Sequence, residues 1–113
     1  MDEALAEALA LLASQQDGGV AADAMATCAK VLANLTAHFG EEKFHRVRVA
    51  NKAFNKKVAS VAGGLEVMGA AGFHLTTDEE TGEAILAYPM LPEPEPPLRR
   101  TLAALQRLGK AYQ

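Results

Sequence analysis

Hydrophobic residues recur at helical spacing through the first forty positions of the chain. A leucine stripe predicts a helix over residues 2 to 15. A second apolar stripe, with alternating spacings of three and four, predicts a buried helical face over residues 21 to 39. Gly18 and Gly19 are expected to separate these two helices. The two stripes consist of Leu5, Leu9 and Leu12, and of Met25, Cys28, Leu32, Leu35 and Phe39.

Apolar runs become shorter in the middle of the chain. They predict two short turns of helix, over residues 41 to 46 and 52 to 58. Ser60 is expected to cap a further helix that runs to Ala71, because serine is a favoured N-cap residue. Gly72 stands where helices commonly end.

After Gly72 the pattern changes from helical spacing to short strands. Residues 73 to 76 and 84 to 88 are rich in aromatic and branched side chains and flank a polar stretch, which predicts a β-hairpin. Residues 89 to 97 contain all five prolines of the chain and are expected to form an extended connector. A closing helix is predicted from Leu98, Leu102, Leu105 and Leu108. The expected fold class is α+β, mainly α, with a helical bundle and a small antiparallel β-hairpin packed near the C-terminal helix.

Length and composition favour one compact domain over residues 1 to 113. Half of the 113 residues are hydrophobic, which is enough for one core. Cys28 is the single cysteine, so no internal disulfide can form. No apolar run is long enough to cross a bilayer, and Asp2 and Glu3 stand where a signal peptide needs positive charge. We therefore expect a soluble cytoplasmic or nuclear domain.

Positive charge is concentrated between Lys43 and Lys57. Six Lys or Arg and no carboxylate fall within these fifteen residues, although the chain has a formal net charge of -3. This segregation predicts a face for an acidic partner. Two phenylalanines and two asparagines are interleaved with the cations. These are the residue types needed to bind a short acidic peptide that has an apolar anchor.

The run from residue 33 to 73 reads ANLTAHFGEEKFHRVRVANKAFNKKVASVAGGLEVMGAAGF, and its spaced positions of interest are Asn34, Lys43, Arg48, Asn51, Phe54, Glu66, Gly72 and Phe73. This run resembles the PUB domain, the peptide:N-glycanase and ubiquitin-associated module. The family pattern has an Asn in a helix, a Lys-Tyr-Arg-like step, an Arg-x-x-Asn-x-x-Phe step, and a Gly-x-x-Glu helix that ends in Gly-Phe, and these positions are in register with it. The predicted hairpin and closing helix also follow the order of the family.

The resemblance implies a non-catalytic, monomeric adaptor domain of the ubiquitin and ER-associated degradation pathways. PUB domains bind the C-terminal tail of the hexameric ATPase valosin-containing protein, which is a short acidic segment with an aromatic residue near its end. Carried over by position, the peptide-binding groove would be lined by Asn34, Lys43, Phe44, Val47, Arg48, Asn51 and Phe54. No cofactor, nucleic acid or membrane partner is implied.

Each of these residue types suits a peptide ligand. The carboxamides of Asn34 and Asn51 can pair with peptide backbone groups. Lys43 and Arg48 would meet the carboxylates of the tail. Phe44, Val47 and Phe54 would form an apolar slot for the anchor residue. Phe44 stands where the family usually has Tyr, so the slot is more apolar. Ala62 replaces a position that is often basic, which bears on peptide preference.

Other interpretations of the same residues remain open. Asn51 also suits a helix N-cap, and both phenylalanines suit a core. The basic face over residues 43 to 57 could bind nucleic acid or another polyanion, although the acidic chain disfavours this. The module could also bind a different tyrosine-containing peptide. Residues 94 to 99, PEPPLR, match a PxxPxR pattern that SH3 domains bind as a polyproline II helix.

Catalysis and metal binding are not expected. The histidines, at positions 38, 45 and 74, are not at metal-ligand spacing, and Cys28 lies on the buried stripe without a partner histidine. His45 is expected to be a surface side chain because it lies within the basic run. The carboxylates of the predicted hairpin loop, Asp78, Glu79, Glu80 and Glu83, are expected to form a solvated turn.

Overall fold

The computed structural model describes residues 3–15 and 17–111. Its helices are α1 (Glu3–Ala13), α2 (Gly18–Ala37), η1 (Glu42–His45), α3 (Lys52–Phe54), η2 (Asn55–Ala59), α4 (Gly64–Ala71) and α5 (Pro96–Ala111). Its strands are β1 (Arg46–Arg48), β2 (His74–Thr77) and β3 (Ala84–Ala87). The mainly helical α+β fold predicted from the sequence is confirmed.

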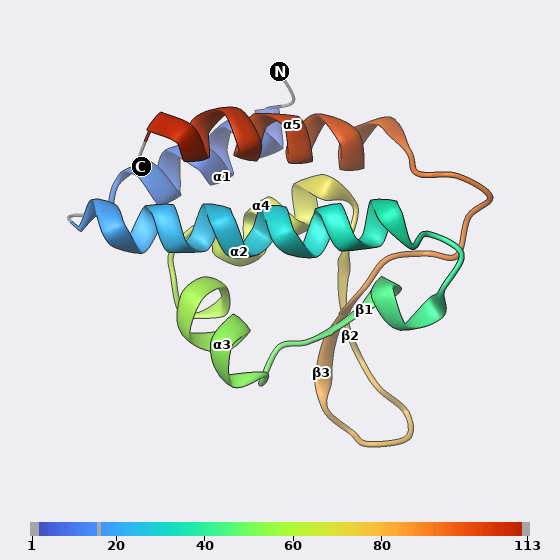
Figure 1. Cartoon of the computed structure of the whole chain (residues 1–113). Coiled ribbons are helices and arrows are strands. Elements are labelled where there is room, and N and C mark those ends of the chain that lie inside the picture. The colour runs from blue at the N-terminus through green and yellow to red at the C-terminus, as the bar shows by residue number, and fades with distance from the viewer. Residues whose placement is uncertain (1–2, 16, 112–113) are drawn as a thin grey trace.

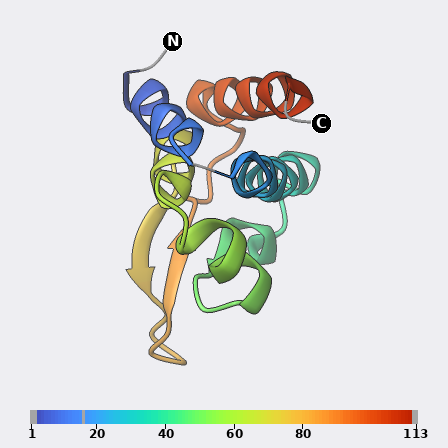
Figure 2. The same cartoon turned by 90° about the vertical axis from the view of Figure 1, so that its left-hand side faces the viewer.

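Helix α2 is the centre of the arrangement. Figure 1 shows α1 and α5 on one side of α2, and α3 with the three strands on the opposite side. Figure 2, in which α2 is seen end-on, shows the same order of layers. The fully buried side chains of the core include Leu12, Met25, Leu32, Leu35, Met68, Leu98 and Leu105. No helix in the described ranges is long and apolar enough to cross a membrane.

Helix α2 begins three residues earlier than predicted. The Asp17 carboxylate accepts a hydrogen bond of 2.8 Å from the Gly19 amide and serves as N-cap. The two glycines that were expected to separate the helices therefore form the first turn of α2. An N-cap side chain satisfies an amide that the first turn leaves unpaired, so it can start a helix even at glycine.

Helix α4 begins at Gly64 rather than near Ser60, so the predicted cap is wrong. The Ser60 amide instead donates to the Asn55 and Val58 carbonyls and closes η2. Gly63 has a φ of 93°, and a Cβ atom there would lie 2.6 Å from the Ala8 carbonyl oxygen. Glycine is therefore required where α1 approaches the start of α4. The predicted end at Gly72 is confirmed, with a φ of 119°.

The sheet has three antiparallel strands in the order β1-β3-β2. The predicted hairpin corresponds to β2 and β3, and is confirmed. The helical turn predicted over residues 41 to 46 is confirmed by η1, but strand β1, which begins at Arg46, was not predicted. Its central residue, Val47, pairs with Leu86 on β3. With one inward-facing side chain in three residues, β1 has too short an alternation to be recognised from the sequence.

Helix α5 begins inside the predicted connector. Pro96 and Pro97 form its first turn, where the missing amide donors cost little. Leu98 is fully buried and Leu105 nearly so, which confirms that this helix packs on the core. Because residues 96–99 are helical, the PxxPxR segment does not present a polyproline II conformation. The SH3-ligand alternative is therefore not supported.

Candidate peptide-binding site

A ring stack joins the end of α2 to η1. The His38 and Phe44 rings are stacked with centroids 4.4 Å apart and an interplanar angle of 15°. The Lys43 Nζ atom lies 5.2 Å from the centroid of the Phe44 ring. Asn34 is exposed one turn before His38, and its carboxamide forms no hydrogen bond with other described residues. Predicted residues from two separate elements therefore share one surface.

Strand β1 carries two more predicted residues, whose side chains point to opposite faces of the strand. Val47 is half-buried and packs against the core. The Arg48 guanidinium makes a bidentate ion pair with Glu83, with N···O distances of 2.9 and 3.0 Å. This carboxylate raises the pKa of Arg48 further above its ordinary value, by hydrogen bonding and by Coulombic attraction. Arg48 is therefore accessible but already paired within the chain.

Asn51 and Phe54 have structural roles at the start of α3. The Asn51 side-chain oxygen accepts a hydrogen bond of 3.1 Å from the Phe54 amide, so Asn51 is the N-cap. Phe54 is 4% exposed and belongs to the core. The structure thus does not bring Phe54 into a surface slot with Phe44 and Val47. We use the name α2–β1 face for the accessible set Asn34, Lys43, Phe44, Val47, Arg48 and Asn51.

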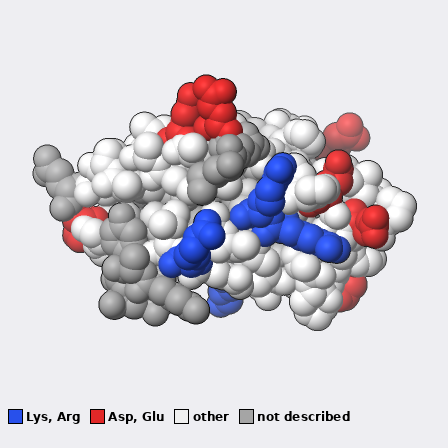
Figure 3. Space-filling view, turned by 90° about the horizontal axis from the view of Figure 1, so that it is seen from above, with Lys and Arg blue, Asp and Glu red and all other residues white. Residues whose placement is uncertain are grey.

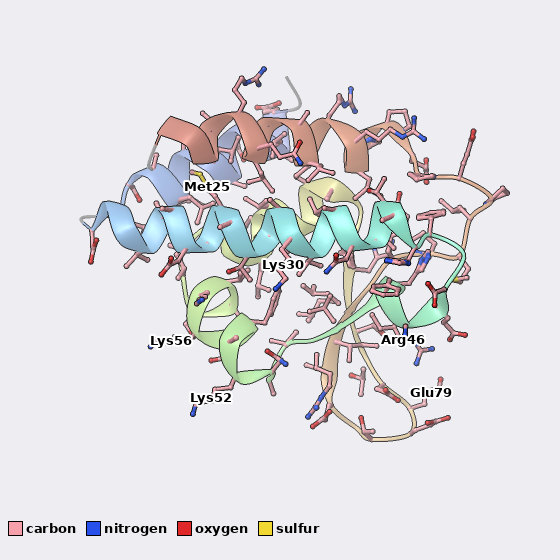
Figure 4. All side chains as sticks on the ribbon, viewed as in Figure 1. Met25, Lys30, Arg46, Lys52, Lys56 and Glu79 are labelled. Carbon is pink, nitrogen blue, oxygen red and sulfur yellow. The ribbon has the colours of Figure 1, made fainter. Side chains whose placement is uncertain are left out.

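The remaining cations of the basic run lie outside this face. Figure 4 shows Lys52 and Lys56 projecting outward from α3 and η2, away from α2. Within the described part of the chain, neither forms an ion pair. Lys30 was not among the predicted site residues, yet Figure 4 shows it leaving α2 toward α3. The sequence feature that indicates Lys30 as a site residue is its position one helical turn before Asn34, on the same side of α2.

A second basic surface lies on the other side of the molecule. Arg99, Arg100 and Arg107 are exposed on α5. Figure 3 looks onto this side and shows basic side chains near its middle, with acidic ones toward the edges. Positive charge on the folded chain is thus not confined to residues 43 to 57.

His45 is buried, in contrast to the surface position expected from its basic neighbours. It is 1% exposed. Its Nδ1 atom lies 3.1 Å from the Tyr88 carbonyl oxygen, and its Nε2 atom lies 2.7 Å from the Phe39 carbonyl oxygen. The rings of Phe39 and Tyr88 surround it. The two carbonyl groups satisfy the buried ring nitrogens in place of water. His45 thereby joins the segment after α2 to the segment after β3, behind the α2–β1 face.

Two other chemically distinctive features are the cysteine and the acidic turn. Cys28 is buried, and desolvation raises the pKa of its thiol to about 12. Among the described residues, no group of three or more His, Cys, Asp or Glu side chains could hold a metal ion. The predicted acidic turn is largely exposed, and the Asp78 carboxylate accepts from the Glu80 amide at 2.9 Å.

A hollow of about 290 Å³ lies beside the acidic turn rather than on the α2–β1 face. Its lining includes Arg46, Ile85 and Glu79, but none of the seven predicted peptide-binding residues. Figure 4 shows Arg46 and Glu79 on the same side of the three strands, to the right in that view. The hollow has no aromatic or amide side chain to orient a peptide, so we do not assign the site to it.

The fold and the accessible amide, cationic and apolar side chains define a small protein-interaction domain. A sequence model of the PUB domain family matches residues 20–103, and the chain belongs to this family. UBX domain-containing protein 6 of Caenorhabditis elegans is 42% identical to the chain over 60 residues. That similarity covers 53% of this chain and 13% of the relative, so the chain spans a small part of the relative's length.

Proposed function

We propose that this PUB domain is a non-catalytic adaptor module that binds the acidic, aromatic-containing C-terminal tail of valosin-containing protein. The family match supports it, since residues 20–103 include every residue of the α2–β1 face. The main structural support is the contact between His38 and Phe44, which holds the exposed side of α2 beside η1 and β1. A ligand that crosses this contact would meet amide, cationic and apolar groups together.

The two asparagines suit the backbone of an extended peptide in different ways. The Asn34 carboxamide is unengaged and can both donate and accept a hydrogen bond. The Asn51 oxygen is used by the N-cap, so its amide group remains as a donor. When a peptide leaves water, each backbone group left unpaired costs about 1–3 kcal/mol. Both side chains would therefore stabilise the bound peptide.

The cations and apolar groups would select an acidic peptide with one large anchor. Lys43 is exposed and free of ion pairs within the described chain, so it can meet a carboxylate directly. Arg48 would have to share or exchange its carboxylate partner Glu83. Val47 and the uncovered part of Phe44 would contact the aromatic residue of the tail. Phe54 is buried and would not contact the tail directly.

The affinity should be modest because a short flexible tail loses conformational entropy when it binds. We expect a Kd in the micromolar range, or about -8 kcal/mol. Attachment of several such domains to one partner could add avidity, because the ATPase is hexameric and displays several tails.

Calorimetric titration with a synthetic tail peptide tests the proposal. The wild-type domain should bind the peptide with micromolar affinity and should not bind a scrambled peptide. Asn34→Ala should weaken binding about tenfold while leaving the thermal unfolding midpoint unchanged, since the side chain is exposed and unpaired. Equal binding of the two peptides, or no binding of either, would rule out the tail-receptor function.

A further inference from the structure

Lys30 lies at the end of the α2–β1 face nearest α3. It is exposed on α2, and Asn34 follows it by one helical turn on the same side of the helix. In Figure 4 its side chain leaves α2 toward α3. No ion pair with another described residue neutralises it. A free ammonium group therefore stands beside the carboxamide of Asn34.

The spacing along α2 gives the length of ligand that this group can reach. The opposite end of the face is marked by His38, whose ring stacks on Phe44. Lys30 and His38 are eight residues apart, which corresponds to about 12 Å along a helix axis. An extended peptide covers that length with about three to four residues, at roughly 3.3–3.6 Å each.

We infer that Lys30 is a further peptide-binding residue, which selects partners with an acidic side chain three or four residues from the aromatic anchor. This inference rests on the proposed function, because it places the anchor of the same ligand against Phe44. A lysine ammonium is a flexible point charge, so it can accept a carboxylate without a fixed approach angle. It should affect both the choice of peptide and its association rate.

Lys56 provides a matched control for this charge. It is also an exposed lysine without an ion pair in the described chain, and it lies on η2. Figure 4 shows it projecting away from α2. Loss of either lysine changes the net charge equally, so only a local role on the α2–β1 face can make their effects differ.

A double-mutant cycle tests the inference. Lys30→Gln and Lys56→Gln would each be titrated with the tail peptide and with variants in which one Asp or Glu is replaced by its amide. Lys30→Gln should weaken binding of the parent peptide about three- to fivefold. One peptide variant replaces the acidic residue three or four positions from the aromatic residue. With that peptide, Lys30→Gln and the wild type should bind equally well. Lys56→Gln should change binding less than about twofold.

The outcomes separate the two proposals. If the wild type binds the tail and Asn34→Ala weakens it, but Lys30→Gln matches Lys56→Gln, the Lys30 role is overturned and the proposed function stands. The Lys30 role would also be overturned if Lys30→Gln lost the same affinity with each amide-substituted peptide, whichever acidic residue was replaced. Absence of wild-type binding would overturn both. Unchanged thermal midpoints for the two lysine variants would show that any difference arises in binding.

Discussion

The two halves of the basic run differ in what their side chains contact. In Lys43–Arg48 two of the three cations are paired, Arg46 with Glu42 at 3.2 Å and Arg48 with Glu83, and Lys43 lies near the Phe44 ring. In Lys52–Lys57 no cation has an ion-pair partner among the described residues. Ion pairs thus hold two cations of the first half, whereas the cations of the second half are exposed and unpaired within the described chain.

The apolar residues of the two halves differ in burial, and here the second half makes the closer contact with the rest of the protein. Phe44 and Val47 in the first half are half-buried, whereas Phe54 is buried in the second. The second half is therefore anchored through its apolar side, and its lysines face water. One continuous charged run in the sequence thus supplies a candidate binding surface and a separate supporting turn.

The largest expected effect is on stability, from truncation of the buried phenylalanine. Phe54→Ala should lower the free energy of unfolding by about 3–5 kcal/mol, because it leaves a cavity in the core. Phe44→Ala should lower it by about 1 kcal/mol, since that ring is only half-buried. Urea denaturation followed by circular dichroism measures both. Similar losses for the two variants would remove the distinction between the halves.

Asn51 lies between the two halves and should affect both stability and binding. Asn51→Ala should cost about 1 kcal/mol of stability, because the N-cap hydrogen bond to the Phe54 amide is lost. Asn51→Asp keeps a capping oxygen but removes the amide donor. It should retain stability and weaken tail-peptide binding in calorimetry. Unchanged binding by Asn51→Asp would leave Asn51 with the capping role alone.

The Arg48–Glu83 pair should compete with an acidic ligand. Glu83→Gln should tighten binding of the tail peptide about two- to fivefold, because it frees the guanidinium from a surface ion pair. Glu80→Gln is the control, since it removes the same charge from the same turn without breaking an ion pair in the described chain. Calorimetry would show whether the two variants differ. Equal effects would mean that Glu83 does not compete.

The smallest effects are expected in the solvated half. Lys52→Gln should change the free energy of unfolding by less than about 0.5 kcal/mol, because the side chain is exposed and unpaired in the described chain. It should slow association of the tail peptide less than Lys43→Gln does, as measured by stopped-flow fluorescence at low salt. A larger effect from Lys52→Gln would show that the peptide lies over α3 instead.

Long apolar periodicity made most of the fold predictable from the sequence. The stripe through Met25 and Leu32 predicted α2, and the hairpin followed from two branched runs around a polar turn. The start of α2 was missed because Asp17 was not recognised as a cap. Strand β1 was missed because its pairing with β3 is a tertiary contact and only three residues long.

The candidate site was predictable in its chemistry but not in its geometry. The basic run and the family pattern identified Lys43, Arg48 and Asn34, which the structure shows to be exposed. Nothing local to the sequence distinguishes Phe54 from Phe44, because packing against the core decides their burial. His45 was misplaced for the same reason, since its ring is held by two distant backbone carbonyls. Charge density along a chain therefore does not determine which side chains face outward.

Chemical-shift mapping tests most directly whether the α2–β1 face binds the tail. Isotopically labelled domain would be titrated with the tail peptide, and its backbone amide resonances followed. The largest shifts should occur at Asn34, Lys43 and Val47, with little change at Arg100 and Arg107 on the opposite side of α2. Shifts concentrated on α5, or an absence of shifts at saturating peptide, would contradict the assignment of the binding face.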